Sequence, residues 1–178
     1  AMRHPPKQEQ MAEVVQLFED LRKAVPPKLP ADAAREVLRQ QEAALEETST
    51  EAGDEDTSAL YKRGVLEEAD QVNKTIDVVM ADMSHLGTAL LGRSVLDIAA
   101  LELYEHLRDT TVPASWDRNR MRLRKPLPAW MESLRERAAW FGGQLASLKL
   151  TQNIRIPLPI VPLALYSMPH QYLRTLLL

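Results

Sequence analysis

The stretch GTALLGRS, from Gly87 to Ser94, is the part of the sequence closest to a known chemical motif. A phosphate-binding loop reads glycine, four further residues, glycine, lysine and then serine or threonine; here Arg93 occupies the lysine position. Such a loop follows a buried strand, and its backbone N–H groups surround the phosphates. The residues around Gly87 therefore decide whether this stretch can bind a nucleotide.

Those residues have the period of a helix rather than that of a strand. Apolar residues recur at alternating spacings of four and three, which keeps them on one helical face. They are Val65, Ala69, Val72, Ile76, Val79, Met83, Leu86 and Leu90. The pattern predicts one long amphipathic helix from Val65 to Leu91 that passes through Gly87, and we therefore expect the protein to bind no ATP.

The second half of the motif then has a purely structural interpretation. Gly92 is predicted to be the residue that ends this helix in a left-handed conformation. Ser94, followed by Asp97 at the third position, resembles a capping box and is predicted to be the N-cap of the next helix. The apolar stripe expected on that helix is Leu96, Ala100, Leu103 and Leu107.

The other residues with catalytic or metal-binding chemistry are scattered along the sequence. The four histidines, which have no metal-ligand spacing, are His4, His85, His106 and His170. The absence of cysteine excludes disulfides, thiolate metal sites and cysteine nucleophiles. Glu67, Glu68 and Asp70 are expected on the solvated face of the long helix. The sequence predicts no catalytic, cofactor-binding or metal site.

Composition favours a mainly α protein, a helical bundle built around the long helix. Only 5% of the 178 residues are aromatic, and Leu, Ala, Glu and Arg dominate. A net charge of −3 gives no bulk attraction to nucleic acid or anionic lipid. The basic connector between Arg118 and Lys125 is interpreted as a solvated loop, and the apolar run Leu158 to Tyr166 is too short to cross a membrane. Neither nucleic acid nor membrane is expected as a partner.

An acidic stretch, EETSTEAGDED, marks the expected internal boundary. Residues 1–56 are predicted to form short helices and a linker, and residues 57–178 a helical region. The final third is β-branched and rich in proline, which predicts short extended segments near the C-terminus followed by a helix. Three leucines at the end, on an apolar helix face, predict that these residues belong to a longer polypeptide.

Two prolines and two tryptophans define the segment between residues 113 and 130. Pro113 is predicted to end a helix, and Pro126 to occupy the first position of another. Trp116 and Trp130 lie beside these helix ends, and we expect both to be core anchors. The apolar face expected on the last of these helices is Leu127, Trp130, Leu134, Ala138, Phe141, Leu145 and Leu148, with Gly142 and Gly143 as an early break.

The order of several motifs resembles the C-terminal region of dynein heavy chains. That family has an Asn-Lys helix start, an apolar stripe, a glycine turn, a Leu-Glu pair, VP-x-x-W and a KPL-x-x-W helix ending in an arginine. The matching residues are Asn73, Lys74, Gly92, Ser94, Leu101, Glu102, Val112, Pro113, Trp116, Lys125, Pro126, Leu127, Trp130, Leu134 and Arg137. The resemblance covers about residues 57–178, and residues 1–50 resemble the end of the sixth AAA module.

The resemblance implies a non-catalytic region of a microtubule motor, because the family's ATPase sites lie in earlier AAA modules. It implies packing on neighbouring AAA modules of the same heavy chain, and modulation of force, processivity and ATPase coupling. Microtubules and other dynein subunits would be partners through the whole motor. The family is cytoplasmic and cytoskeletal, and the KPL-x-x-W wording is closer to axonemal members of a cilium or flagellum. One alternative is a free-standing helical adaptor that shares the tryptophan pattern, and another is a nucleotide-binding protein that uses the stretch from Gly87 to Ser94.

Overall fold

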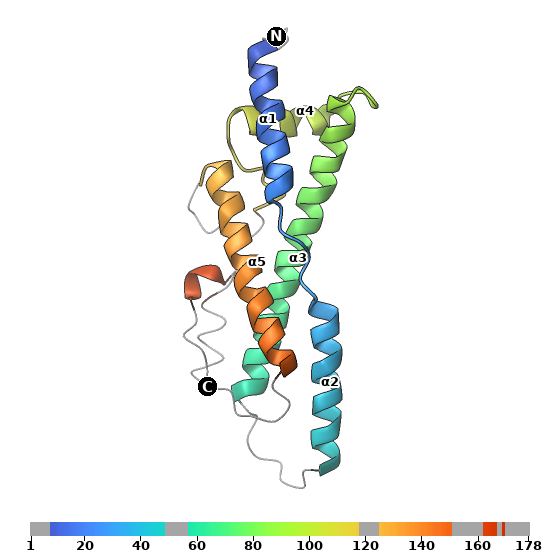
Figure 1. Ribbon diagram of the computed structural model, residues 1–178, viewed down its shortest axis with the longest axis vertical. Helices are drawn as coiled ribbons and strands as arrows, with labels where there is room; N and C mark the ends of the chain where they lie inside the picture. Colours follow the sequence, from blue (N-terminus) through green and yellow to red (C-terminus); the bar gives the residue numbers. More distant parts are fainter. Residues whose placement is uncertain (1–7, 49–56, 118–124, 151–161, 167–168, 170–178) are drawn as a thin grey trace. The chain divides into compact units, whose positions relative to one another are not determined.

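A computed structural model describes residues 8–48, 57–117, 125–150, 162–166 and 169. Within these ranges the protein is helical and contains no strand, which confirms the predicted mainly α class. The predicted extended segments and final helix fall largely on residues 151–161 and 170–178, outside the described residues. The helices in Figure 1 are α1 Gln8–Ala24, α2 Ala31–Thr48, α3 Thr57–Leu90, α4 Ile98–Arg108, α5 Leu127–Leu150 and the short 3-10 helix η1 Leu163–Leu165.

The fold divides into two compact units, and two helices supply residues to both. Unit 1 comprises residues 1–27 and 74–135, and unit 2 comprises residues 28–73 and 136–178. The polypeptide passes from one unit to the other within α3 and again within α5. The predicted acidic linker falls mainly on residues 49–56, outside the described residues, so the expected boundary between residues 56 and 57 stays a prediction.

The long helix α3 has the buried stripe that the periodicity predicts. Seven of its eight stripe residues are at most 3% exposed: Val65, Ala69, Val72, Ile76, Val79, Met83 and Leu86. Leu90, the eighth, is half-buried. The helix passes through Gly87 and ends at Leu90, one residue before the predicted end. Alternating three- and four-residue spacing is sufficient to predict the buried face of α3, because this spacing keeps every apolar side chain of the stripe on one face of a helix.

The core of unit 1 forms where α1 and α4 meet the second half of α3 (Figure 1). On α1, Val14, Phe18 and Leu21 are buried. Gly87 of α3 allows a close approach in this packing, because a Cβ atom there would lie 3.1 Å from Cζ of Phe18, a tight contact. The first glycine of the nucleotide-like motif is therefore a point of close helix contact.

In unit 2 Asn73 on α3 bonds to Leu29, which lies in the proline-rich segment between α1 and α2. The Asn73 side chain accepts the Leu29 N–H at 2.7 Å and donates to the Leu29 carbonyl at 2.9 Å. This segment has few backbone donors because it is rich in proline, and only part of its backbone is bonded locally, as where the Leu29 carbonyl accepts the Ala31 N–H at 2.8 Å. The two hydrogen bonds from α3 add to this local bonding.

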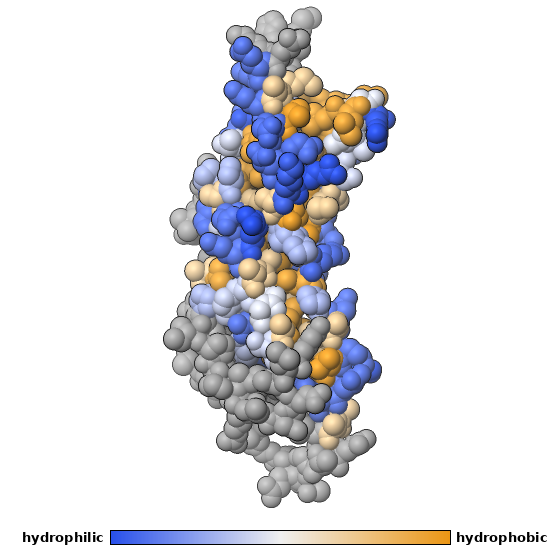
Figure 2. Space-filling view, viewed as in Figure 1, coloured by the Kyte–Doolittle hydropathy of each residue, from blue (hydrophilic) through white to orange (hydrophobic). Residues whose placement is uncertain are grey.

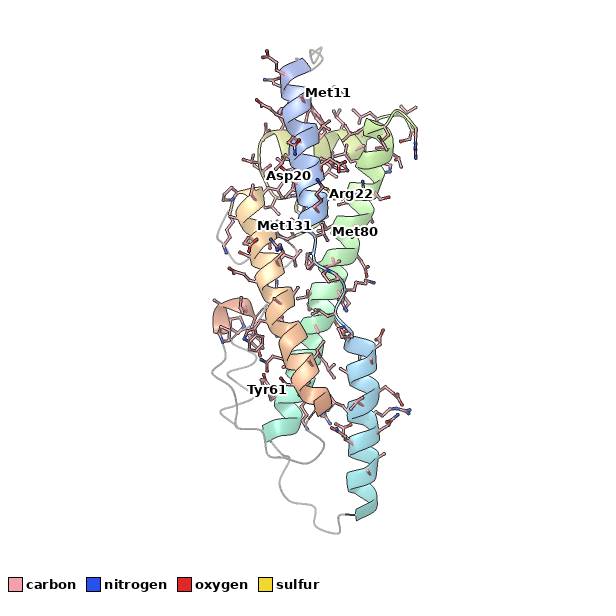
Figure 3. All side chains as sticks on the ribbon, in the orientation of Figure 1. Met11, Asp20, Arg22, Tyr61, Met80 and Met131 are labelled. Atoms are coloured by element: carbon pink, nitrogen blue, oxygen red, sulfur yellow. The ribbon has the colours of Figure 1, made fainter. Side chains whose placement is uncertain are left out.

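Unit 2 also buries a charged pair. Glu68 is 8% exposed, and its carboxylate lies 3.4 Å from the Arg137 guanidinium on α5. The expectation that Glu68 belongs to the solvated face is wrong for this residue, because Arg137 supplies a partner inside the unit. Asp70 accepts a hydrogen bond from Arg35, and the hydroxyl of Tyr61, near the start of α3 in Figure 3, donates to Gln144 at 2.7 Å.

Helix α5 has the predicted apolar face but lacks the predicted early break. It continues to Leu150 through both glycines. A Cβ atom at Gly142 would make an ordinary 3.4 Å contact with Leu29, and one at Gly143 would meet nothing within 4 Å. A glycine pair weakens a helix without ending it when apolar contacts on either side hold the helix in place, as Phe141 and Leu145 do here.

We expect Gly143→Ala to stabilise the protein by about 0.5–1 kcal/mol, because alanine has the higher helix propensity and the site has room for a methyl group. Thermal unfolding followed by circular dichroism measures the shift. Gly92→Ala is the control with the opposite expected sign, because the φ angle of Gly92 is +68°. A destabilised Gly143→Ala variant would show that something covers this face of α5.

Candidate functional site

Three of the six predicted site residues come together in unit 1. Trp116 is buried, at 2% exposure, and Trp130 is half-buried. Their ring centroids are 5.7 Å apart with planes tilted by 36°. The buried Pro113 accepts the Trp116 N–H on its carbonyl at 3.1 Å, so a tight turn directs the Trp116 ring inward. The role of the two tryptophans as core anchors stays a prediction until it is measured.

The residue that holds this turn in place carries no signal in the sequence pattern. Indole Nε1 of Trp116 donates to Oδ2 of Asp82 on α3 at 2.7 Å, and the Ser115 hydroxyl donates to the same oxygen at 3.4 Å. Asp82 lies beside the apolar stripe, and its partner follows 34 residues later. Periodicity finds apolar faces only, so it does not identify a polar contact over such a separation.

We expect Trp116→Phe to destabilise the protein by about 1–3 kcal/mol, because the part-buried Asp82 carboxylate loses its indole donor. Urea denaturation measures the change. Asp82→Ala should cost less in the Trp116→Phe background than in the wild-type protein, as a double-mutant cycle reports for contacting groups. Trp130→Phe is the matched control and should cost less than Trp116→Phe; equal losses from the two would argue against the Asp82 bond.

A strained residue follows the end of α4. Thr110 has a φ of +50°, which disfavours a β-branched side chain. The Thr110 N–H donates to the Leu107 carbonyl at 3.1 Å, and the Thr111 N–H donates to the His106 carbonyl at 2.9 Å. These two bonds form a Schellman motif. The Thr110 carbonyl accepts the N–H of Leu127, the first residue of α5, at 2.8 Å. This bond satisfies a donor that has no partner within its own helix.

Pro126 lies one position earlier in the helix than predicted. Helix α5 begins at Leu127, and the Pro126 carbonyl accepts the Trp130 N–H at 3.0 Å, so the proline is the N-cap rather than the first helical residue. A proline is tolerated both at the N-cap and at the first helical position, because neither position needs a backbone N–H donor. Pro126 itself is exposed.

Thr110→Asn is expected to stabilise the protein by about 0.5–1 kcal/mol, because asparagine adopts the left-handed conformation more readily than a β-branched residue. The midpoint of urea denaturation is the measurement. Thr110→Val, which keeps the branched Cβ, is the control and should give no gain. If both variants lost stability, the Thr110 hydroxyl would contribute more to the stability of the protein than the backbone strain at Thr110 costs.

The predicted role of Gly92 at the end of α3 is confirmed. Gly92 has a left-handed backbone, and its N–H bonds to the Ala89 carbonyl at 3.0 Å. The N–H of Arg93 reaches the Thr88 carbonyl at 2.9 Å. These two bonds form a Schellman motif. The nucleotide-like stretch is therefore the end of a helix and the turn that follows it.

The predicted role of Ser94 as an N-cap is wrong. Helix α4 begins at Ile98 and is capped by Asp97, whose carboxylate accepts the Ala100 N–H at 2.9 Å. The Ser94 hydroxyl instead lies 3.2 Å from the hydroxyl of Thr88, and so belongs to the end of α3. Leu96, predicted on the apolar stripe of α4, precedes the helix and is 45% exposed.

The carboxylate of Asp97 contacts both helices that this turn joins. It lies 2.9 Å from Nε2 of His85 on α3. The Ala100 N–H and, to a smaller extent, His85 hold the pKa of the Asp97 carboxyl below its usual range. A negative charge here also interacts favourably with the N-terminus of α4. Polar groups of the turn thus bond to one another and to the helices it joins.

Aliphatic side chains of the same turn face outward. We call residues 91–98 the α3–α4 corner. Leu91 is 69% exposed, Val95 86% and Ile98 78%. Figure 2 shows hydrophobic surface at this end of unit 1, beside the end of α3. An exposed apolar cluster on a defined turn is typical of a surface for protein contacts.

The described residues show neither a cluster of metal-ligating side chains nor a membrane-crossing helix. Within those ranges no three His, Cys, Asp or Glu side chains are placed to hold an ion. None of the described helices combines the length and the apolar character that a transmembrane span needs. His85 bonds to Asp97, and His106 bonds to the hydroxyl of Thr111 at 2.8 Å.

Comparison with known proteins identifies the family. The family model for the C-terminal domain of dynein heavy chains matches residues 3–177. The protein belongs to this family. No curated protein and no solved structure matches it significantly. The match spans almost the whole sequence and includes residues 3–56, which precede the region of about residues 57–178 where the resemblance is expected. Membership in this dynein family implies association with the rest of a motor.

Several residues of the dynein-like pattern make contacts between distant parts of the sequence. Asn73 and Arg137 are residues of the dynein pattern that make two long-range polar contacts in unit 2. Trp116 and Trp130 of the same pattern form the ring pair of unit 1. These residues of the dynein-like pattern are therefore ones that fix connections between helices and the segments around them.

Proposed function

We propose that this dynein C-terminal domain is a non-catalytic part of the motor, which packs on neighbouring AAA modules of the same heavy chain. The observation that carries the proposal is the family match over residues 3–177. In this proposal the domain modulates force, processivity and the coupling of ATP hydrolysis to movement. Microtubules and other dynein subunits are its partners through the intact motor only.

The geometry of the nucleotide-like stretch supports a non-catalytic role. Gly87 is helical and lies against Phe18, and Gly92 and Arg93 complete the Schellman motif at the end of α3. The N–H groups of Gly92 and Arg93 bond to helix carbonyls, so these two donors are not free to surround a phosphate. ATP hydrolysis in the motor would therefore take place in other modules of the heavy chain.

We place the parent motor in the cytoskeleton, in the axoneme of a cilium or flagellum. The support is the KPLPAW wording from Lys125 to Trp130, which is closer to axonemal than to cytoplasmic dyneins. In the structure this segment contains the start of α5 and the half-buried Trp130. The free-standing adaptor is the less supported alternative, because the family match describes a domain of a heavy chain.

Deletion of the matched segment, residues 3–177, from the intact heavy chain tests the proposal. We expect basal ATPase activity to survive, because the hydrolytic sites lie elsewhere, and stall force or run length on microtubules to change. Gly143→Ala in the intact motor is the control for a harmless change in the same domain. If the deletion left stall force, run length and microtubule-stimulated ATPase all unchanged, the modulatory role would be refuted.

A further inference from the structure

We propose that the α3–α4 corner is a preformed docking knob that inserts Leu91, Val95 and Ile98 into an apolar, acid-rimmed pocket elsewhere on the same heavy chain. The inference deepens the proposed function and rests on it. It names the surface of the domain that makes the contact and the chemistry of the surface that receives it.

The first argument is the division of side chains within the corner. Two of its polar side chains bond to neighbouring groups: Asp97 caps α4 and meets His85, and Ser94 meets Thr88. Its four aliphatic groups, Leu96 included, face solvent at 45–86% exposure. A surface loop without a partner more often has polar side chains at most of its exposed positions, whereas half of the residues of this corner are exposed aliphatic ones.

The second argument is rigidity. The corner is closed by the Schellman motif at Gly92 on one side and by the Asp97 cap on the other. The Thr88 hydroxyl also donates to the His85 carbonyl at 2.8 Å, which holds the last turn of α3. Ordering a loop on binding is costly, and a turn already fixed by hydrogen bonds avoids most of that cost.

The third argument is size, which favours a partner on the same polypeptide. Four partly exposed aliphatic side chains offer on the order of 300 Å² of apolar surface to a partner. A stable interface between separate proteins buries roughly 800 Å² on each partner. A knob of this size is too small to hold two free copies together, but sufficient when a linker keeps the partner surface at high effective concentration.

The fourth argument is charge. Arg93 lies in the middle of the corner and is exposed, and its guanidinium pairs with no acidic side chain among the described residues. A cation surrounded by aliphatic groups is best matched by an apolar pocket with a carboxylate at its rim. Figure 2 shows the neighbouring hydrophobic surface that such a pocket would cover.

Hydroxyl-radical footprinting of the intact heavy chain tests the knob directly, because it reports the solvent access of individual aliphatic side chains. In the intact heavy chain we expect Leu91, Val95 and Ile98 to be oxidised more slowly than other aliphatic side chains of similar exposure, because the pocket covers them. Met80, on α3 away from the corner (Figure 3), is 47% exposed and serves as the internal reference. Corner residues oxidised as fast as exposed aliphatic side chains elsewhere in the motor would overturn the inference.

Two substitutions then separate the contributions of shape and charge. Val95→Asp should weaken docking about tenfold, as expected for losing one aliphatic contact, and so raise the oxidation of Leu91 and Ile98. Arg93→Glu should have the same direction of effect if a carboxylate lines the pocket. Met80→Asp is the matched control and should leave the corner protected. Unchanged protection in both corner variants would exclude the knob, and a loss confined to Val95→Asp would exclude the acidic rim.

Failure of the knob and failure of the proposed function give different results. If deletion of the domain alters force or run length while the corner stays open to radicals, the modulatory function stands and another surface makes the contact. If the corner is protected but deletion changes no motile parameter, docking occurs without modulation. Circular dichroism of each variant domain checks that its helices are retained.

Discussion

The continuous apolar face of α3 is the constraint on which both units depend. Because seven stripe residues are buried along one helix, other parts of each unit must supply side chains that cover this face. In unit 1 that cover comes from α1 and α4, and at Gly87 a Cβ atom would lie only 3.1 Å from the ring of Phe18. Burial of apolar surface drives the arrangement, and a glycine allows the closest approach.

Segments without regular structure are held to the helices by a few hydrogen bonds. Asn73 bonds to both backbone groups of Leu29, Asp82 holds the indole of Trp116, and the Thr110 carbonyl accepts the Leu127 N–H. A part-buried polar group without a partner costs more than its hydrogen bond contributes, so each of these contacts selects one path for its connection. The left-handed backbone of Thr110 is strained, and it places the Thr110 carbonyl where it accepts the N–H of Leu127 at the start of α5.

The α3–α4 corner shows how a sequence can resemble a nucleotide motif for unrelated reasons. A left-handed glycine, a serine and a cationic side chain are useful in a phosphate-binding loop, and the same residue types are useful where one helix ends and another begins. The element before the glycine decides between the two. Here that element is a helix, the N–H groups of Gly92 and Arg93 are already bonded to it, and half of the exposed residues of the corner are aliphatic.

The sequence alone determined the mainly helical fold, the buried face of α3 and the turn at Gly92, because these depend on local spacing and on the backbone freedom of glycine. It also identified the dynein-like order of residues. The tertiary structure decided which polar group meets which partner: Asp97 rather than Ser94 caps α4, and Arg137 makes Glu68 a buried residue. A capping side chain is chosen by where the helix starts in space, and an acid can be buried only when a distant cation lies beside it. Neither condition is visible in the spacing of residues along the sequence.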